Sequence, residues 1–433
     1  MKKDYQKKAA SVAIDAELVV PDVVSVAMAD IAETAREGLL ALAVTAGLQV
    51  MDALMAESVT AICGPKGKHD AQRTAVRHGS DDGSVVLGGR RVPVRRPRVR
   101  SADGERELAV PAYELFSATD LLDAMATERM LGKLSSRRYR LGLEPVGTEV
   151  EATAKSTSKS AVSRRFVRAT ERAVAELMEA DLSQLDLVAV MIDGVHFAGH
   201  CCVVALGISI DGTKHPLALE EGDTENTTVV RDLLAGLRDR GLDTTRPMLF
   251  VLDGAKALHA GVKAVFDRPA IQRCQLHKIR NVEAKLPDRL ARTVASKMRA
   301  AYRSDNALKA ESDLRALAAE LRKAHPGASA SLLEGVDETL TVVRLGVPPT
   351  LRSTLRSTNA IESMIEICRD HSRNVKRWRD GEMVVRWCAA GMLEAAKQFR
   401  RVKGHLHLRA LRAALDSHFD VTPIDYNNEE AAA

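Results

Sequence analysis

The sequence predicts an α/β protein built on a mixed sheet, with an all-helical insertion in the core and helical regions before it. Two apolar runs, Leu187 to Ile192 and Met248 to Leu252, have the length and composition of buried strands, and Asp-Gly follows each one. The 60 residues from Asp193 to Asp253 leave room for two more strands and a helix. The 109 residues from Asp253 to Glu362 exceed what one helix and one strand require. The core is therefore interrupted before Glu362.

The elements between the two aspartates follow from their local patterns. Residues 199–210 (GHCCVVALGISI) and 213–222 (TKHPLALEEG) are typical of strands, and Thr227 to Arg240 places apolar residues at helical spacing. This order predicts three adjacent strands, a crossover helix, and a strand that returns beside the first.

The long interval before Glu362 is almost wholly helical in pattern. Apolar and charged residues alternate at helical spacing in Leu286 to Arg303, Asn306 to His325 and Ala328 to Val343. The sequence GVPPT at 346–350 then ends the pattern before STNAIES begins the helix of Glu362. From its pattern alone, this segment could be a scaffold of helices that packs on the core.

The remaining boundaries follow from composition. The stretch Leu39 to Met55 is apolar but amphipathic and interrupted, which predicts a buried helix or a helix–helix interface. The acidic tail around Asn427 to Glu430 predicts a disordered end. The predicted regions are a helical N-terminal region (1–82), an arginine-rich β-ribbon (83–111), a helix-turn-helix-like region (112–183), the core (184–283 and 348–408), the helical insertion (284–347) and a C-terminal tail (409–433).

Asp193, Asp253 and Glu362 carry the main chemical signal. An Asp at the end of a core strand is costly to ionise unless a cation neutralises it. Two such strands and a helical Glu therefore indicate a shared divalent cation, and oxygen-only ligands favour magnesium or manganese over zinc. Each Asp-Gly pair alone could be an ordinary turn, but the combination of three favours the metal site.

Six motifs place the chain near a known family: IDGVHF, GDTEN, LDGAKAL, QRCQLHKIRN, STNAIES and RNVKRWRDG. From about Glu57 to Leu408 the chain resembles the mutator-type transposases of bacterial insertion sequences, which are of the Asp-Asp-Glu class and have a ribonuclease-H-like core. The resemblance implies that Asp193, Asp253 and Glu362 are the catalytic residues and bind two Mg²⁺ (or Mn²⁺) ions, roughly 3.5–4 Å apart.

The resemblance also implies a reaction and its partners. Such an enzyme binds the terminal inverted repeats of its element, nicks the DNA to free a 3′-hydroxyl, and joins that hydroxyl to double-stranded target DNA, often through a circular intermediate. The insertion would help to hold element ends and protomers together. Catalysis on two ends predicts a homodimer or a larger assembly on DNA. Lys256, Arg356 and Arg369 are candidates to steady the phosphate, although a solvated charged face explains any one of them.

Cys274 and His277 are three residues apart at an expected turn from a strand into a helix. Structural zinc usually needs four ligands, and Cys63, His69 and His78 are too scattered to complete the site. The family carries this Cys-x-x-His signature after its second aspartate, which implies that His277 orients a catalytic carboxylate or touches a phosphate. The alternative is a core histidine beside a buried cysteine.

Basic residues gather in three clusters, which we predict to contact DNA. In an extended, proline-broken segment, alternation would place several guanidinium groups on one face of a ribbon suited to duplex phosphates. An exposed basic strand without a partner is the alternative, but six like charges repel one another unless acidic groups are near. The first cluster consists of Arg90, Arg91, Arg95, Arg96, Arg98 and Arg100.

The second cluster belongs to a helix capped by Ser158 or Ser160, and the third follows the glutamate helix. The helix resembles the recognition half of a helix-turn-helix, whose target would be the terminal inverted repeat, unless it is an ordinary amphipathic helix. Trp378 could stack on an unpaired terminal base or be a partly buried anchor. The second cluster is Arg164, Arg165 and Arg168, opposite the apolar stripe of Val162, Phe166, Ala169 and Ala173; the third is Arg373, Lys376, Arg377 and Trp378.

Composition fits a large DNA-handling protein of the bacterial cytoplasm, associated with the nucleoid. The chain has 433 residues and 45% hydrophobic residues, enough for about two to four domains. Its six cysteines show no paired framework, and it has neither a clear membrane span nor a signal-peptide pattern. The net charge of +5 is modest, so the DNA-binding hypothesis depends on local clustering.

Two other function classes fit parts of the pattern. A structure-specific nuclease on the same core would hydrolyse DNA without strand transfer, but the separate end-binding region and the long insertion argue against it. A DNA-binding regulator derived from a transposase would keep the fold and lose the chemistry, but all three carboxylates are present.

Overall fold

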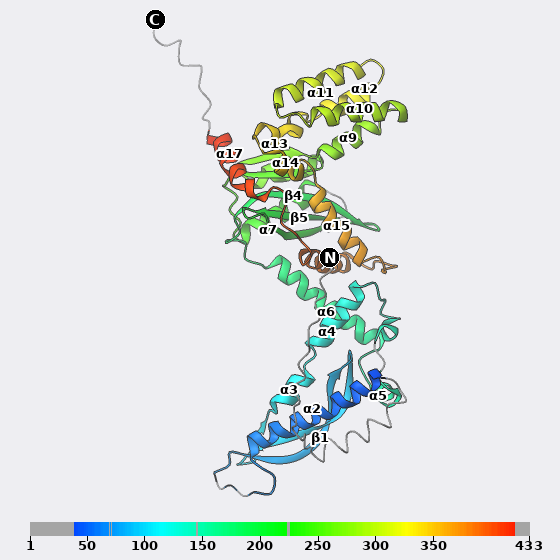
Figure 1. Ribbon diagram of the computed structural model, residues 1–433, viewed down its shortest axis with the longest axis vertical. Coiled ribbons are helices and arrows are strands. Elements are labelled where there is room, and N and C mark those ends of the chain that lie inside the picture. Colours follow the sequence, from blue (N-terminus) through cyan, green and yellow to red (C-terminus); the bar gives the residue numbers. More distant parts are fainter. Residues whose placement is uncertain (1–38, 69, 71, 144–145, 223–225, 421–433) are drawn as a thin grey trace, which may run out of the picture. The chain divides into compact units, whose positions relative to one another are not determined.

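The computed structural model describes residues 39–420 except 69, 71, 144–145 and 223–225. The chain forms two compact units, one comprising the residues up to Met125 with Arg137–Val162, and the other Ala126–Ser136 with the residues from Ser163 onward. We call them the ribbon unit and the core unit, and Figure 1 follows the chain through each. The predicted disordered end at 427–430 lies outside the described residues.

The ribbon unit is built on a three-stranded antiparallel sheet in the order β1-β2-β3. Its strands are β1 (Ala75–Leu87), β2 (Arg90–Ser101) and β3 (Glu107–Leu108). Gly88 and Gly89 join β1 to β2 with φ of 54° and 75°, a left-handed conformation that suits a two-residue hairpin turn. The other elements are α2 (Leu39–Cys63), α3 (Pro111–Ser117), η2 (Tyr139–Gly142) and α5 (Thr148–Thr153), with α4 (Asp120–Leu131) and α6 (Lys159–Met178) crossing the boundary between the units.

Two expectations for the N-terminal half need correction. The ribbon begins at Ala75 rather than residue 83, because residues 75–82 pair with Arg95–Ser101 around an irregularity between Arg77 and Ser80. α2 is apolar around its circumference rather than amphipathic. Its Leu42–Cys63 portion is by length and composition apolar enough to cross a membrane, yet only 11% of the tested window is buried. It is therefore not a buried helix, and the helix–helix interface remains a prediction.

The core unit contains a five-stranded sheet in the order β6-β5-β4-β7-β8. β4 pairs antiparallel with β5, and β5 with β6, whereas β7 and β8 run parallel to β4. The predicted meander and returning strand are therefore confirmed. The strands are β4 (Leu187–Phe197), β5 (His200–Ser209), β6 (Lys214–Gly222), β7 (Met248–Leu252) and β8 (Pro269–Arg273).

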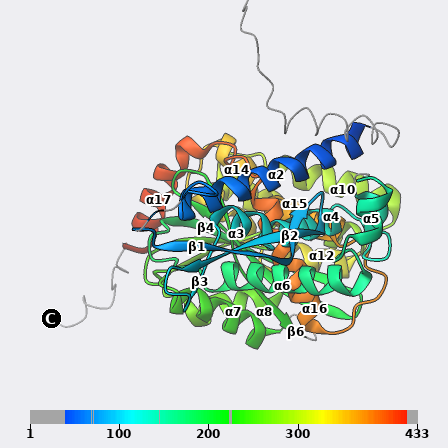
Figure 2. The ribbon, with the colours of Figure 1, turned by 90° about the horizontal axis from the view of Figure 1, so that it is seen from below.

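Helices cover both faces of this sheet. α7 (Thr227–Asp239) and α8 (Lys256–Val265) lie side by side on one face (Figure 2). Asn226 caps α7 by accepting hydrogen bonds from the amides of Thr228 and Val229. The opposite face packs against α15 (Asn359–His371), α16 (Gly381–Ala396) and α17 (Leu408–Asp420). This second face carries the candidate site.

The predicted helical insertion is confirmed, although its third helix is not continuous. In Figure 1, α10, α11 and α12 form a compact group that reaches the sheet through α9. The expected helix from Ala328 to Val343 breaks after Leu333, and Gly335 takes a φ of +61° at the break. The elements are α9 (Gln275–Glu283), α10 (Asp288–Ala301), α11 (Ala307–Leu321), α12 (Pro326–Leu333), η3 (Asp337–Leu340), α13 (Thr341–Arg344) and α14 (Pro349–Leu355).

The segment from residue 409 does not begin a tail, because α17 extends the fold to Asp420 after the short turn η4 (His405–His407). Leu411 and Leu415 of α17 are buried against the core. Arg412 donates hydrogen bonds to the Asp186 carboxylate (2.6 Å) and the Leu187 carbonyl (2.6 Å). α17 thus holds the start of β4 in place.

Candidate active site

The period of the strands places Asp193 and Asp253 on the same face of the sheet. Alternate residues of a strand point to opposite faces, and Met191 and Val195 of β4 pack in the core beneath α15 and α16, whereas Ile192 packs in the other core. In β7, Val251 faces the α15 side in the same way. Ile192 and Leu252 are paired in the parallel ladder, so the two aspartates follow adjacent paired positions.

β4 does not end at Ile192, as the sequence indicated, but continues to Phe197. Beyond Ile192 it remains paired with β5 only, since β7 ends at Leu252. Asp193 therefore lies inside a strand, at the point where the parallel neighbour stops. The turn interpretation of this Asp-Gly pair is wrong, because Gly194 pairs with Val203 in the ladder.

Asp193 is held in surroundings that disfavour its ionised form. Burial, followed by the charge of Asp253, raises the pKa of Asp193 to about 6, although its carboxylate accepts a hydrogen bond from the Gly194 amide (2.8 Å). Glu362 raises this pKa further, and His277 acts in the opposite direction. The carboxylates are thus close enough to repel one another.

Local hydrogen bonds orient the other two carboxylates. Asp253 lies in the loop between β7 and α8 and accepts a hydrogen bond from the Ala255 amide (2.8 Å). Glu362 is in the first turn of α15 and accepts one from the Thr358 hydroxyl (2.7 Å), the residue that precedes the helix. Sequence reasoning did not single out Thr358.

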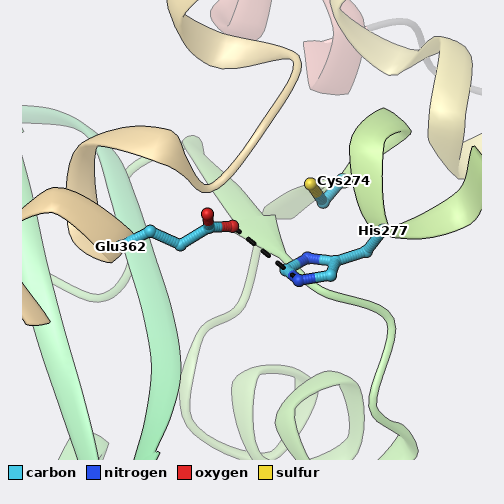
Figure 3. A group of neighbouring side chains, drawn as sticks. All are labelled: Cys274, His277 and Glu362. Carbon is cyan, nitrogen blue, oxygen red and sulfur yellow. Dashed lines mark ion pairs between the residues drawn. The ribbon is translucent and has the colours of Figure 1, made fainter. Parts of the chain in front are cut away.

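Cys274, His277 and Glu362 gather beside the sheet (Figure 3). Figure 3 shows His277 and Glu362 pointing toward each other, with 3.8 Å between Nε2 and Oε1. The Thr358 hydroxyl lies 3.4 Å from both Cys274 Sγ and His277 Nδ1. Within the part of the chain that the structure describes, this is the only group of three candidate ligands whose atoms all lie within 4.8 Å of one another.

The electrostatics of this group favour a charged histidine. Hydrogen bonding to Cys274 raises the pKa of His277 to about 9 against the opposing effect of burial, with further contributions from Glu362 and Asp193. Burial alone would raise the pKa of the Cys274 thiol, but hydrogen bonds with His277 and Thr358 outweigh it and lower the pKa. Cys274 is fully buried and His277 is partly exposed, so only His277 can face a substrate.

A cleft of about 570 Å³ opens at this position. Its basic and polar lining includes Arg280, Asn359 and Arg369, of which the sequence had indicated only Arg369; Lys256 and Arg356 are not among its described lining residues. A signal for Arg280 exists, because it lies one helical turn after His277 on α9. The full lining is Asp193, Gly194, His277, Arg280, Asn359, Glu362, Ser363, Ile365, Glu366 and Arg369.

The donor set of the cleft suits a hard divalent cation. Carboxylate oxygens are the ligands that magnesium and manganese prefer. The raised pKa of Asp193 shows that its carboxylate lacks full compensation among the groups around it. A bound cation would supply that compensation. Asp193 and Glu362 line the cleft and fit such an ion, whereas Asp253 is not among the described lining residues.

Comparison with known proteins identifies the family. The model of the family described as "Transposase, Mutator family" matches residues 22–402. The chain belongs to the Mutator family of transposases.

Individual transposases are similar to this chain, and the aligned part differs in length from one relative to the next. The transposase for insertion sequence element ISRM5 of Rhizobium meliloti (strain 1021) is 25% identical over 393 residues, 90% of this chain and 95% of its own length. The transposase for insertion sequence element IS6120 of Mycolicibacterium smegmatis is 30% identical over 202 residues, 45% of this chain and 61% of its own. A probable insertion sequence transposase of Corynebacterium diphtheriae is 29% identical over 183 residues, 42% of this chain and 52% of its own. The chain thus matches less than two thirds of the last two relatives.

The ribbon arginines of this transposase have partners within the ribbon unit. Arg90 is only 3% exposed and pairs with Glu151 (2.7 Å), so it does not form part of an open basic face. The prediction of a shared DNA-facing role is wrong for Arg90, because its guanidinium is buried. The other contacts are Arg91 to the Ser84 hydroxyl, Arg95 to Asp82, Arg96 and Arg98 to Glu107, and Arg100 to the Gly104 carbonyl.

The second and third basic clusters occupy α6 and the loop after α15. Ser158 caps α6 by accepting a hydrogen bond from the Ala161 amide (3.3 Å), as one of the two predicted caps. Trp378 packs against Phe197 and Trp387 at ring-centroid distances of 5.1 and 6.4 Å, so the anchor interpretation holds. Arg164 and Arg168 on α6 are exposed and Arg165 is half-buried, while Arg373, Lys376 and Arg377 are exposed in the loop.

Proposed function

We propose that this protein transposes an insertion sequence by binding its terminal inverted repeats and performing metal-dependent cleavage and strand transfer. The supporting observation is the arrangement of Asp193, within β4, and Asp253, directly after the adjacent parallel strand β7, on the sheet face that packs against the helix of Glu362. The strand order supports the further proposal that the core is ribonuclease-H-like, since a three-stranded meander is extended by two parallel strands. Family membership supports the activity.

The proposed reaction consists of two phosphoryl transfers. In the first, a water oxygen bonds to the scissile phosphorus, the bond from phosphorus to the 3′-oxygen breaks, and that oxygen leaves as a 3′-hydroxyl. In the second, this 3′-oxygen bonds to a phosphorus of the target DNA, loses its proton, and displaces the target's own 3′-oxygen, which takes up a proton. Each step breaks one phosphodiester bond, and the second step forms one.

Asp193, Asp253 and Glu362 would hold two magnesium or manganese ions, which activate the attacking oxygen and stabilise the leaving one. The other side chains position the substrate. His277, charged at neutral pH, lies beside Glu362 and can contact a phosphate oxygen, while Arg280 and Arg369 line the same cleft. Thr358 keeps Glu362 in its orientation through the 2.7 Å hydrogen bond.

DNA binding outside the cleft would use the exposed members of the basic clusters. Phosphate contacts supply affinity that falls with salt, and they do not read sequence. α6 is the candidate to read the inverted repeat, and the loop after α15 would contact DNA near the cleft. Action on two element ends supports a homodimer or a larger assembly in the cytoplasm, on the nucleoid.

The test is strand transfer on labelled DNA that carries the element's own ends, with Mg²⁺ and with chelator. We expect joining by the wild type with metal, and a loss of about 10³-fold or more in Glu362→Gln. Glu382→Gln, which changes an 85% exposed side chain on α16, is the matched control and should stay active. Metal-dependent cleavage without joining would favour the nuclease. Repeat-specific binding without chemistry in any of the proteins would favour the regulator.

A further inference from the structure

Arg273 is the last residue of β8, and its backbone lies beside the loop that carries Asp253. Leu252, the residue before Asp253, pairs with Arg273 in the parallel ladder. The Arg273 side chain is only 10% exposed, although it belongs to a residue type that is seldom buried without partners. A buried guanidinium at this position requires an explanation.

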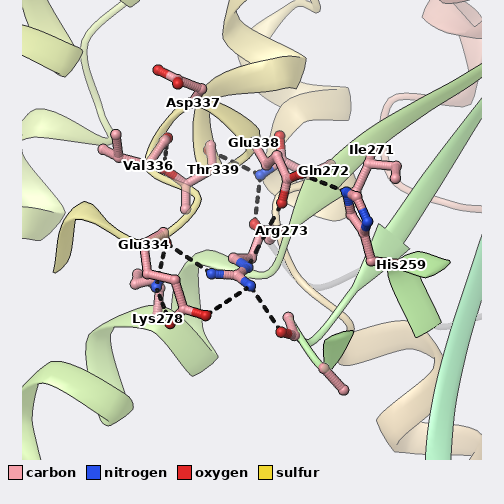
Figure 4. A network of polar contacts seen from close by, with 12 residues as sticks. His259, Ile271, Gln272, Arg273, Lys278, Glu334, Val336, Asp337, Glu338 and Thr339 are labelled. Carbon is pink, nitrogen blue, oxygen red and sulfur yellow. Dashed lines mark hydrogen bonds and ion pairs between the residues drawn. The ribbon is translucent and has the colours of Figure 1, made fainter. Parts of the chain in front are cut away.

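The guanidinium joins two segments that are far apart in the sequence (Figure 4). One terminal nitrogen donates to the Gly254 carbonyl (2.8 Å), directly after Asp253, and the other donates to the Glu334 carbonyl (2.8 Å) in the helical insertion. Arg273 also lies 3.7 Å from the Glu334 carboxylate and 3.8 Å from that of Glu338. It therefore connects the Asp253 loop with the insertion.

Glycines flank the guanidinium on both segments. Gly254 has a φ of +109°, and a Cβ there would come within 2.7 Å of Arg273 Nε. Gly335 has a φ of +61°, and a Cβ there would come within 2.8 Å of Arg273 Nη1. Since real Cβ atoms do not approach other atoms so closely, both loops can hold the guanidinium only as glycines.

A second contact ties the same loop to the insertion from its other side. His259 on α8, the helix that follows the Asp253 loop, contacts the Glu338 carboxylate at 2.7 Å. The other carboxylate oxygen of Glu338 is the one 3.8 Å from Arg273 Nε, which has no hydrogen-bond partner of its own among the described residues. Arg273, which binds the Asp253 loop, and His259, on the helix that follows the loop, thus both lie beside Glu338.

We propose that Arg273 is a positioning residue for Asp253, which clamps the loop of this carboxylate to the helical insertion. The insertion is then part of the metal site's scaffold, and a displacement of its Glu334–Glu338 segment changes where Asp253 presents its oxygens. This inference rests on the proposed metal-dependent function. Arg273 is not among the described residues that line the cleft, and it acts through the loop.

Lys278 offers a matched control. Lys278 is 2% exposed, and its ammonium donates to the same Glu334 carbonyl (2.7 Å) and to the Ser331 carbonyl (2.7 Å), whereas none of its described hydrogen bonds or ion pairs reaches the Asp253 loop. Arg273→Met and Lys278→Met each remove one buried cation that binds the insertion. Only Arg273→Met releases Gly254. Arg273→Lys is the second variant, because it keeps the charge and loses the planar fork that reaches both carbonyls.

The experiment measures two properties of the full-length protein. Hydrogen exchange of the metal-free protein at the Ala255 amide, which donates to Asp253, reports the loop, and titration with Mn²⁺ reports the carboxylates. We expect Arg273→Met to speed the exchange about tenfold and to weaken Mn²⁺ binding by about 10- to 100-fold, with Arg273→Lys in between. Lys278→Met should leave both within about twofold of the wild type while lowering the Tm.

Equal effects of Arg273→Met and Lys278→Met on exchange and on Mn²⁺ affinity would overturn the proposal, because they would reveal a general attachment of the insertion. Unchanged exchange at Ala255 in both Arg273 variants would overturn it as well. If the wild type binds no Mn²⁺, the proposed metal chemistry fails, while the exchange rate at Ala255 still decides whether Arg273 clamps the loop.

Discussion

The sheet face that carries Asp193, which we call the carboxylate face, and the arginine-rich ribbon hold charges of opposite sign. They differ in how far the fold neutralises those charges. On the sheet, burial and the neighbouring Asp253 raise the pKa of Asp193 to about 6. In the ribbon, a hydrogen bond from Arg98 lowers the pKa of Glu107, which also pairs with Arg96. Acidic residues of the ribbon unit pair with Arg90, Arg95, Arg96 and Arg98, whereas Asp193 is buried on the sheet beside a second carboxylate.

This difference separates two kinds of charged cluster that look alike in a sequence. A cluster with incomplete compensation has a free-energy reason to bind an external ion. A compensated cluster binds an external partner only by exchanging its internal one, at a cost set by burial. Arg95 and Asp82 are 65% and 91% exposed, so their exchange costs little, while Arg90 is held in the interior.

The largest expected effect concerns the metal-free carboxylate face. In chelated protein, the folded pKa of Asp193, about 6, exceeds the unfolded value of 3.8, so the unfolded chain releases this proton first as the pH rises. The wild type should therefore lose about 2–3 kcal/mol of stability between pH 4 and 6 that Asp193→Asn keeps. Urea unfolding at pH 4, 5, 6 and 7 measures this difference. If the unfolding free energies of the two proteins changed with pH in the same way, burial of Asp193 would not disfavour its ionised form, and the contrast with the ribbon would fail.

The next effect separates buried from exposed arginines within the ribbon. Arg90→Met should destabilise the ribbon unit by about 2 kcal/mol, less than is usual for a broken buried pair because Arg140 still contacts Glu151 at 2.5 Å. Arg95→Met should change stability by less than about 0.5 kcal/mol. Thermal unfolding of both variants, with DNA affinity measured alongside, makes the test. Similar losses of stability would mean that burial does not distinguish the two arginines.

The smallest effect concerns exchange of internal partners for phosphate. Arg96→Gln and Arg98→Gln should each reduce the slope of log affinity against log salt by about 1 for duplex DNA, without preference for sequence. Glu107→Gln should strengthen DNA binding slightly, because it releases both guanidinium groups. Affinities measured between about 50 and 200 mM salt decide the question. A slope that none of these variants changes would place the phosphate contacts elsewhere in the chain.

Local pattern predicted much of the core. The strand order, the crossover helix after Asn226 and the helical insertion were all predicted, because apolar runs and helical spacing are properties of neighbouring residues. The end of β4 was not, since Asp193 and Gly194 look like a turn and remain in the strand only through their pairing with β5. The prediction of a C-terminal tail from residue 409 failed for a similar reason. Arg412 binds Asp186 and the leucines of α17 pack in the core, and these partners are distant in the sequence.

By itself, the sequence determined most of the core elements and the family, and it singled out the three acidic residues, since these depend on residue type and on spacing along the chain. The tertiary structure alone decided which charges are compensated and how the site is held. It brought Glu107 to Arg98, Glu151 to Arg90, and the Glu334 carbonyl to Arg273. Such contacts depend on burial and on segments that are distant in the sequence but adjacent in the fold. Neither can be read from the order of charged residues along the chain.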